Sequence, residues 1–411
     1  MPSPLPNQAR QKRAKKSRKL TALLVAAFIG AIGYLIGYGN FFDDEGKPPI
    51  VAAGKYHSFI IDGDGVVYAT GNNEFGQLGT GDKDNRDVFT EVESLSAIVA
   101  VAAGDAHSLA LDSGGHVYAA GRNGYGQLGL GDETNRETFA LVDSLRDKNI
   151  TAIAAGDDDS FAIDSDGNVY AAGYNGYGQL GTGDKDNRYA FALVSSLSDK
   201  NVTAIASGYA HVVALNKVGA IYAAGRNGFG QLGLGDKADR RSFTLVDSLE
   251  GKKIVAIASG DAHSLALDSD GKVYATGSNN KSQLGLGDID DRKTFALVSS
   301  LNDANITEIA AGAFHSFALD TGGKIYAAGA NDFGQLGFGD SGYYAARKTF
   351  AFVYLLKDKK IARVAAGDHH SLALDSDNKI YAAGANNYGR LGLGDNDNRK
   401  TFTPVVLPAK D

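Results

Sequence analysis

From residue 50 onward, short apolar runs alternate with short polar clusters, and the same order of runs returns about every 52 residues. These runs are rich in β-branched, aromatic and small apolar residues, and clusters of Gly, Asp and Asn separate them, so each run predicts a β-strand. One copy contains "ITAIAAG" (150–156), "SFAID" (160–164), "NVYAAG" (168–173) and "AFALVSSL" (190–197). The sequence "DSDG" between the second and third runs predicts a hairpin turn.

The sequence Ala-Ala-Gly or Ala-Ser-Gly ends the first run and occurs once in each copy of the repeat. Its glycines are Gly54, Gly104, Gly156, Gly208, Gly260, Gly312 and Gly367, with spacings of 50 to 55 residues. Periods of this size are typical of solenoids and propellers. Four strands in each of seven copies predict an all-β fold, a seven-bladed β-propeller with four-stranded blades over residues 50–411.

The motif Gly-x-Gly-x-x-Gly, which is typical of dinucleotide-binding sites, occurs at 124–129, 176–181 and 228–233. A dinucleotide fingerprint occurs once in a domain and opens a long helix, whereas here a polar sequence without helical period follows. In the other copies a larger residue replaces the first glycine: Glu74, Asn280, Asp332 or Asn387. We interpret this position as a turn that needs a left-handed backbone. The following aromatic residue and Leu would fill the gap between blades, and we expect no cofactor.

The first 49 residues lack the repeat. Residues 1–19 carry seven Lys or Arg and no acidic residue, and Leu20 to Phe42 is a run of 23 residues without a charge. Such a run can span a bilayer, which needs about 20 residues. We therefore expect a basic cytoplasmic tail at 1–19, a transmembrane signal anchor at 20–42 and a polar linker at 43–49. A cleaved signal, and so a secreted protein, is the alternative.

The charges around this span predict its orientation. Basic residues precede it and Asp43, Asp44 and Glu45 follow it, which places the N-terminus in the cytoplasm and the propeller outside the cell membrane, in a bacterial envelope. The chain carries a net charge of -7, and its seven N-terminal basic residues leave the exported part more acidic still. This charge argues against nucleic acid as a partner of the propeller. The chain has no cysteine, so a thiolate metal site is excluded.

The motifs of residues 102–132, "AAGDAHSLALDSGGHVYAAGRNGYGQLGLGD", recur in all seven copies. They resemble the repeat of the regulator of chromosome condensation family, which implies a seven-bladed propeller. The family's eukaryotic namesake is a nucleotide-exchange factor on chromatin, and we do not expect that activity from an acidic, exported, membrane-anchored domain. The chain also lacks Trp, which many repeats of the family carry before the glycine of the third strand.

Histidine recurs at one position of the repeat, usually with Ser after it. The residues are His57, His107, His211, His263, His315 and His370, with Asp159 in the third copy. A catalytic or metal site needs one distinctive, convergent set of groups, whereas six equivalent copies indicate a structural hydrogen bond. We therefore predict structural histidines, no metal site and no enzyme activity.

The loop "GDKDNR", at 81–86 and 183–188, resembles a calcium loop in its alternating Asp, but it lacks the later bidentate Glu. An Arg recurs at its end in every copy. We therefore predict an Asp–Arg pair or loop-to-backbone bonds in each loop, with calcium as the alternative.

Function in a repeat protein is expected where the copies differ. Two variable positions follow each Ala-x-Gly phrase, and a third follows the glycine of the third strand. Successive blades would bring them to one end of the ring, as a face of acidic groups, aromatics and Arg, and the last two are common interface anchors. The candidate partner-binding residues are Lys55, Tyr56, Asp105, Arg122, Asp157, Asp158, Asp159, Tyr174, Tyr209, Arg226, Asp261, Phe314, Asp368 and His369. The same positions are equally compatible with ordinary solvated loops.

These patterns predict a non-enzymatic, extracytoplasmic binding or scaffold module that recognises a protein partner through one face of the propeller. A glycan-binding or hydrolytic propeller that uses the ring mouth is one alternative, and the run Asp157-Asp158-Asp159 is the acidic cluster that would serve it. A purely architectural envelope protein is another. The insertion "SGYYAA" (341–346) is a second contact candidate.

Overall fold

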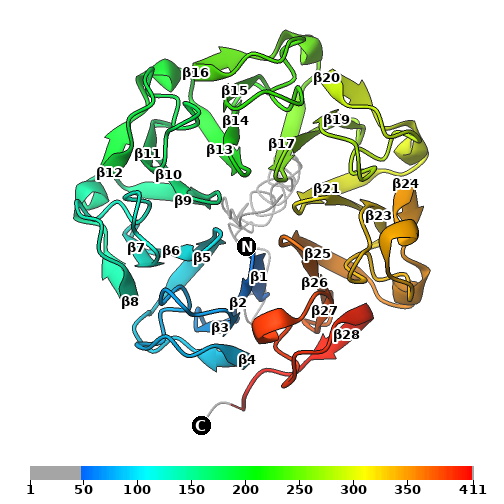
Figure 1. Ribbon diagram of the computed structural model, residues 1–411, viewed down its shortest axis with the longest axis horizontal. Helices are drawn as coiled ribbons and strands as arrows, with labels where there is room; N and C mark the ends of the chain where they lie inside the picture. Colours follow the sequence, from blue (N-terminus) through cyan, green and yellow to red (C-terminus); the bar gives the residue numbers. More distant parts are fainter. Residues whose placement is uncertain (1–47, 410–411) are drawn as a thin grey trace, which may run out of the picture.

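The computed structural model describes residues 48–409, which form seven blades around a central axis (Figure 1). Each blade is a four-stranded antiparallel sheet whose strands follow one another in chain order from the axis outward. The predicted all-β seven-bladed propeller with four-stranded blades is confirmed. The predicted tail, the predicted anchor and residues 43–47 of the predicted linker lie outside the described residues. No helix within 48–409 is long and apolar enough to cross a bilayer.

The first four blades contain the strands β1 (Ile50–Ala53), β2 (His57–Ile61), β3 (Val67–Gly71), β4 (Arg86–Glu91), β5 (Ile98–Ala103), β6 (His107–Asp112), β7 (Val117–Gly121), β8 (Arg136–Leu141), β9 (Ile150–Ala155), β10 (Asp159–Asp164), β11 (Val169–Gly173), β12 (Arg188–Leu193), β13 (Val202–Ser207), β14 (His211–Asn216), β15 (Ile221–Gly225) and β16 (Arg240–Leu245). The last three contain β17 (Ile254–Ser259), β18 (His263–Asp268), β19 (Val273–Gly277), β20 (Arg292–Leu297), β21 (Ile306–Ala311), β22 (His315–Asp320), β23 (Ile325–Gly329), β24 (Arg347–Phe352), β25 (Ile361–Ala366), β26 (His370–Asp375), β27 (Ile380–Gly384) and β28 (Arg399–Val405).

Short 3₁₀ helices interrupt the connections. They are η1 (Asp143–Leu145), η2 (Ser195–Leu197), η3 (Asp247–Leu249), η4 (Ser299–Leu301), η5 (Tyr343–Ala345), η6 (Tyr354–Leu356) and η7 (Asn387–Gly389). The fourth predicted strand of the third copy, 190–197, is shorter than expected, because β12 ends at Leu193 and η2 follows. The turn returns Leu197 to the core, where it is 1% exposed.

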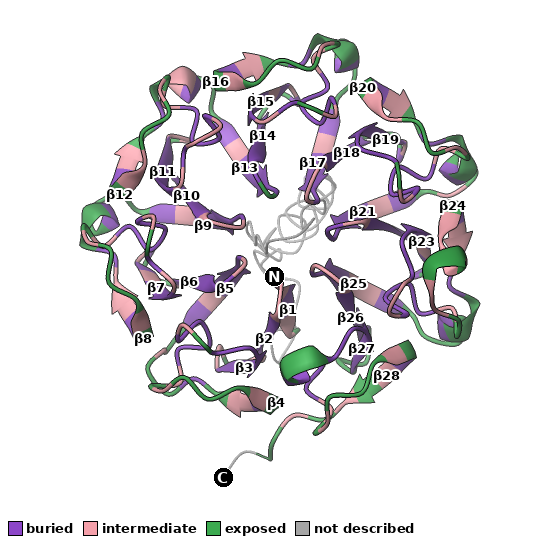
Figure 2. Cartoon of the chain, viewed as in Figure 1, coloured by how far each residue is buried: buried purple, intermediate pink, exposed green. Residues whose placement is uncertain are grey.

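The hydrophobic core lies between the blades. Each of the seven buried clusters joins two neighbouring blades, and the second strand of every blade is almost wholly buried while the fourth is largely exposed (Figure 2). The Leu of the repeated phrase is part of this core, as predicted, since Leu128 is completely buried. The aromatic residue of the phrase is not, because Tyr125 is only half-buried.

The ring closes without an exchange of strands between the termini. The first blade consists of β1 to β4 and the last of β25 to β28. At the closing interface Leu393 pairs with Val88 across the blades, as Thr80 does with Thr138 between the first two blades. The last and first blades are therefore joined by the same contacts that join the others.

The recurring histidines make structural hydrogen bonds between blades, as predicted. His107 Nε2 lies 2.9 Å from Ser160 Oγ in the next blade, and the Ser160 hydroxyl donates to the Gln127 carbonyl. Because that donation uses the only hydroxyl hydrogen, the histidine must be the donor to Ser160. The same pair recurs at five more interfaces: His57–Ser108, His211–Ser264, His263–Ser316, His315–Ser371 and His370–Ser58.

The interface between the third and fourth blades differs from these six. Asp159 replaces the histidine and Val212 replaces the serine that would receive it, and both are completely buried. Ser207, on the innermost strand of the fourth blade, donates to Asp159 Oδ1 over 2.6 Å instead. The two substitutions therefore belong together, because either alone would leave a buried polar group without this partner.

The left-handed interpretation of the first glycine in "GYGQLG" is wrong. Gly124 has no positive φ, and a Cβ added there would meet nothing within 4 Å. The position accepts Glu, Asn and Asp because it faces open space. The left-handed residues are the later glycines, Gly126 (φ 79°) and Gly129 (φ 67°).

The Asn and Asp side chains of the third-to-fourth-strand loop hold that loop together. Asn123 Oδ1 accepts from the Leu128 N–H at 3.0 Å, and its amide donates to Asp132. Asp132 in turn accepts from Arg136 over 2.6 Å. The predicted Asp–Arg pair is confirmed in every copy: Asp82–Arg86, Asp132–Arg136, Asp184–Arg188, Asp236–Arg240, Asp288–Arg292, Asp340–Arg347 and Asp395–Arg399.

Candidate binding face around the central cavity

One end of the ring is formed by two loops from each blade, one joining the first strand to the second and one joining the third to the fourth. We call this end the loop face. The antiparallel order of the strands brings the variable positions after each Ala-x-Gly phrase and after each third-strand glycine to this same end. The sequence-predicted candidates other than Asp159 belong to these loops.

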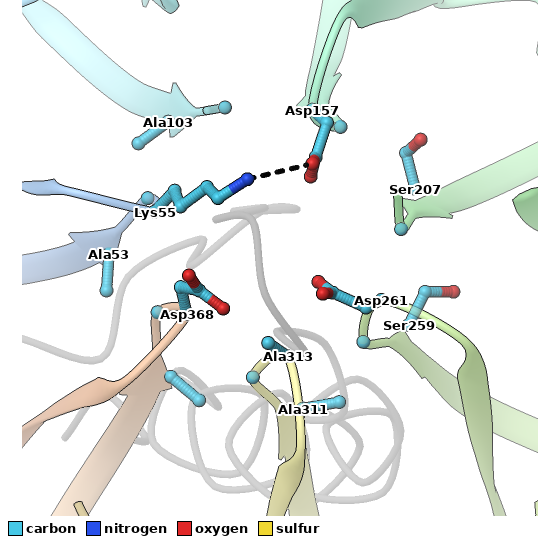
Figure 3. A pocket seen from close by; sticks show the side chains of 18 of the residues that line it. Ala53, Lys55, Ala103, Asp157, Ser207, Ser259, Asp261, Ala311, Ala313 and Asp368 are labelled. Carbon is cyan, nitrogen blue, oxygen red and sulfur yellow. Dashed lines mark hydrogen bonds and ion pairs between the residues drawn. The ribbon is translucent and has the colours of Figure 1, made fainter. Parts of the chain in front are cut away.

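At the centre of the loop face lies a cavity of about 60 Å³ (Figure 3). Its wall consists mainly of Ala, Gly and Ser from the innermost strands, and the charged side chains that line it are Lys55, Asp157, Asp261 and Asp368. The blades approach one another so closely here that a Cβ at Gly208 would collide with the Gly260 carbonyl. The glycines of the repeated phrase are therefore required by this close packing.

Among residues 48–409, Lys55 is the one cationic side chain that lines the cavity. Its Nζ lies 3.5 Å from Asp157 Oδ2 and 3.6 Å from Asp105 Oδ2. Burial disfavours the charged ammonium, but the carboxylates of Asp157 and Asp105 overcome this effect and raise the pKa of Lys55 above its usual value. Lys55 therefore stays protonated and neutralises one side of the cavity.

The acidic groups crowd one another. Burial, and then the Asp261 charge, raise the pKa of Asp157 well above its usual value. Burial and the nearby Asp368 raise the pKa of Asp261 to about 7. Since like charges close together cannot all ionise freely, this side of the cavity favours a proton or another cation.

A cluster of aromatic rings around Arg122 flanks the cavity. The guanidinium carbon of Arg122 lies 5.4 Å from the Tyr125 ring centre, and Arg122 Nη1 is 3.7 Å from Asp158 Oδ1. Tyr174 packs against Tyr125 with ring centres 5.0 Å apart. These contacts order Arg122 and Tyr174 before any partner arrives.

A similar arrangement follows in the next blades. The guanidinium carbon of Arg226 lies 5.4 Å from the Tyr177 ring centre and 5.8 Å from that of Phe229. Tyr209 is 45% exposed, so its ring is free to contact another molecule. On the opposite side of the ring, Phe314 stacks on His369 with ring centres 6.1 Å apart.

Comparison with known proteins identifies the repeat. A family model for the RCC1-like domain matches residues 191–411, more than half of the chain, and models of the regulator of chromosome condensation (RCC1) repeat match 64–111, 114–163 and 166–215. The chain belongs to the RCC1 repeat family. It is 32% identical over 371 residues to the ultraviolet-B receptor UVR8 of Arabidopsis thaliana, covering 89% of this chain and 83% of the receptor. It is 36% identical over 211 residues to the probable E3 ubiquitin-protein ligase HERC4 of Mus musculus, covering 51% of this chain and 20% of the ligase.

Solved structures share the ring. Yeast RCC1 (Prp20), crystallised with Kap60 bound, superposes with a TM-score of 0.73 at 25% identity, over 82% of this chain and 83% of that one. Human WBSCR16 superposes with a TM-score of 0.74 at 20% identity, over 84% and 94% of the two chains, a likeness that shows the fold alone.

Within this RCC1-repeat ring, the three adjacent acids of the third blade do not converge. Asp157 faces the central cavity, Asp158 lies beside Arg122 on the loop face, and Asp159 points into the interface with the fourth blade. Asp159 is completely buried, so it does not present its side chain to a partner. A glycosidase-like pair of carboxylates on either side of one bond is not formed by this run.

Sequence reasoning missed one residue of the RCC1-repeat loop face. Arg390 stands where the other six copies have Gln, and it is 2% exposed. Its Nη1 donates to the Lys55 carbonyl over 3.0 Å, and its guanidinium carbon lies 4.9 Å from the Tyr56 ring centre. Arg390 therefore fixes the loop that carries Lys55, and its departure from the Gln column was the signal that could have found it.

The inserted segment at 341–346 presents two tyrosines to solvent. Tyr343 and Tyr344 are 72% and 96% exposed. Within residues 48–409, no group of three or more His, Asp or Glu side chains is arranged to hold a metal ion.

Proposed function

We propose that this propeller is a non-enzymatic module that binds a protein partner through its loop face. The observation that carries the proposal is the cluster of Arg122, Tyr125 and Tyr174 beside an acidic central cavity. Arg and Tyr are enriched among residues that dominate interface energetics, and here they are held in place by their own contacts. Since little side-chain entropy remains to be lost, such a surface suits tight recognition.

The relatives support a binding role. The matched family includes a receptor, and yeast RCC1 has been crystallised with Kap60 bound to it. A second structure of yeast Prp20p, at 24% identity, is described together with its binding to Gsp1p and histones. Those partners belong to those proteins, and the loop residues of this chain set its own specificity.

The direction of the innermost strand supports an outward-facing loop face. Strand β1 starts at Ile50 and leads to Lys55 on the loop face, so the chain enters the ring from the opposite end. We propose a single-pass anchor at Leu20 to Phe42, joined by residues 43–49, which span at most about 25 Å. This arrangement holds the opposite end near the membrane and turns the loop face away from it, outside the cytoplasm.

Cysteine labelling tests this location, because the natural chain has no cysteine. In intact cells a membrane-impermeant maleimide should label Tyr209→Cys and should label Lys12→Cys only after lysis. Labelling of both positions only after lysis would contradict the extracytoplasmic location.

Cross-linking followed by affinity capture from intact membranes tests the binding proposal. The bait is the full-length chain, compared with an Arg122→Ala, Tyr174→Ala double variant. The matched control is Arg146→Ala with Tyr354→Ala, which removes one Arg and one Tyr from exposed positions on η6 and beside η1, at the end opposite the loop face. We expect a discrete partner that the loop-face variant loses and the control keeps. Equal capture by both variants would contradict the proposal.

A further inference from the structure

The carboxylates around the central cavity are unequally neutralised. Asp105 and Asp157 share the ammonium of Lys55, at 3.6 Å and 3.5 Å. Asp368 belongs to the blade next to that of Lys55, whereas Asp261 lies on the far side of the cavity (Figure 3). Neither carboxylate forms an ion pair with Lys or Arg among the described residues. Asp105 and Asp157 therefore have a cationic partner, whereas Asp261 and Asp368 have no Lys or Arg partner of their own.

Asp368 has an unsatisfied buried oxygen. Its side chain is 8% exposed, and Oδ1 has no hydrogen-bond partner among the residues that the structure describes. Figure 3 shows its carboxylate directed into the cavity, facing that of Asp261. Its other oxygen lies 3.6 Å from His369 Nε2, but burial lowers the pKa of His369, so that imidazole is neutral at neutral pH. Buried acceptors normally have a donor, and a carboxylate directed into the cavity is placed to receive one from a ligand there.

The shape of the cavity limits what that donor can be. About 60 Å³ is enough for a small group and little more, and the wall around Asp261 and Asp368 includes the methyl groups of Ala311 and Ala313. An unbranched aliphatic stem fits such a wall, whereas a planar guanidinium needs room for its fork. No set of three ligands for a metal ion is formed within 48–409, which favours an organic cation.

We propose that the central cavity receives one lysine side chain of the protein partner, with its ammonium between Asp261 and Asp368. An ammonium has three donors and no acceptor, so it can donate both to the unsatisfied Oδ1 of Asp368 and to the carboxylate of Asp261. The methylene stem lies along the Ala and Gly wall, and the ammonium of Lys55 repels a second cation. This inference rests on the proposed function and specifies the chemistry that the partner presents.

A binding titration with a defined probe tests the inference. The probe is a fluorescent, end-capped Ala-Ala-Lys-Ala-Ala peptide, and its control replaces Lys with norleucine, which keeps the stem and removes the ammonium. With full-length protein in detergent micelles, we expect saturable binding of the lysine peptide and at least tenfold weaker binding of the norleucine peptide. Equal binding of the two peptides, or no saturable binding of the lysine peptide, would overturn the inference.

Variants of the cavity make the test specific. Asp261→Asn and Asp368→Asn should each weaken the lysine peptide at least tenfold, while Asp303→Asn, which makes the same change at an exposed position before β21, should not. Lys55→Met should strengthen binding, because it removes the competing ammonium, and it gives a gain of affinity that misfolding cannot imitate. Unchanged affinity in the Asp261 and Asp368 variants, or no gain in Lys55→Met, would overturn the inference.

The two proposals can fail separately. If the lysine peptide does not bind but the Arg122→Ala, Tyr174→Ala variant still loses its captured partner, the lysine site is wrong and the binding face stands. If neither experiment discriminates its variants from its controls, both are wrong.

Discussion

The imidazole of His370, in the last blade, lies with its Nε2 2.8 Å from the hydroxyl of Ser58, in the first. The same hydroxyl donates to the Arg390 carbonyl over 2.8 Å. These bonds close the ring between residues more than 300 positions apart in the chain. They take the place that an exchanged strand would otherwise have.

Removal of this hydroxyl should loosen the ring. Ser58→Ala leaves the buried His370 N–H and the Arg390 carbonyl without their partner, so we expect a loss of about 1–3 kcal/mol in the free energy of unfolding. Urea denaturation measures it. Ser113→Ala, at an exposed hairpin turn, is the control and should change stability by less than about 0.5 kcal/mol. Equal effects of the two substitutions would show that the bond does not contribute to closure.

Acid should destabilise the propeller through the histidines. Burial lowers the pKa of His57, His263 and His315 to about 3 and that of His107 and His211 to about 4. These folded-state pKa values lie below the unfolded value of about 6.5. The contribution of the neutral histidines to the free energy of unfolding is therefore complete above pH 6.5 and is lost as the pH falls toward 3.

Buried acids oppose part of this loss. Burial is the largest cause that raises the pKa of Asp159, Asp261 and Glu308 to about 7. The folded state therefore binds protons at these groups before the unfolded state does, and their protonation increases the free energy of unfolding as the pH falls from 7 toward 4. We therefore expect a shallow decline of unfolding free energy from pH 6.5 to about 4.5 and a steeper one below, measured by urea denaturation across this range. His263→Gln should flatten the decline. A stability that rises as the pH falls from 6.5 to 4 would show that the buried histidines do not dominate the response to acid.

Asp159 gives a matched test with the opposite sign. Its folded pKa is raised by burial, so protonation stabilises the folded state and this stabilisation is lost as the pH rises from about 4 to about 7. Asp159→Asn keeps an oxygen that can accept from Ser207 and cannot ionise. We expect equal stability of the variant and the natural chain near pH 4, and a variant more stable by roughly 2–4 kcal/mol at pH 8. An Asn variant that is less stable at pH 8 would show that the carboxylate itself is needed.

Two glycines of the repeat should differ in their tolerance of a methyl group, because one lies against the next blade and the other faces open space. Gly208→Ala places a methyl group against the Gly260 carbonyl of the next blade and should cost about 3 kcal/mol or more in thermal unfolding experiments. Gly228→Ala meets nothing within 4 Å and should change stability by less than about 0.5 kcal/mol. A comparable loss at both positions would mean that the blades do not approach one another as described.

The repeat made the fold predictable from the sequence. Each strand is short, but Ala-x-Gly recurs seven times, and His-Ser and Asn-x-aromatic-Gly-Gln-Leu-Gly recur in most of the copies, which fixes both the blade and the count. The structural histidines and the Asp–Arg pairs followed from the same logic, since a group present in almost every copy serves a contact that every blade makes. The left-handed assignment at Gly124 failed because a column of Gly, Asn, Asp and Glu reflects either a strained backbone or open space, and composition alone does not separate them.

The candidate site was predictable only in outline. The variable loop positions do gather at one end, but the sequence did not show that Asp157, Asp158 and Asp159 point to three different surroundings, because that depends on the turn between β9 and β10. The pairing of Asp159 with Ser207 joins neighbouring copies, and the position of Arg390 depends on ring closure. Contacts between blades cannot be deduced from one copy of the repeat.

Site-specific photocross-linking in intact cells shows directly which end of the ring contacts a partner. A photoreactive amino acid replaces Tyr209, which is 45% exposed on the loop face, or Tyr354, which is 60% exposed at the opposite end. We expect a discrete protein adduct from position 209 and none from position 354. An adduct from position 354 alone, or no discrete adduct from position 209, would contradict the loop face as the partner-binding surface.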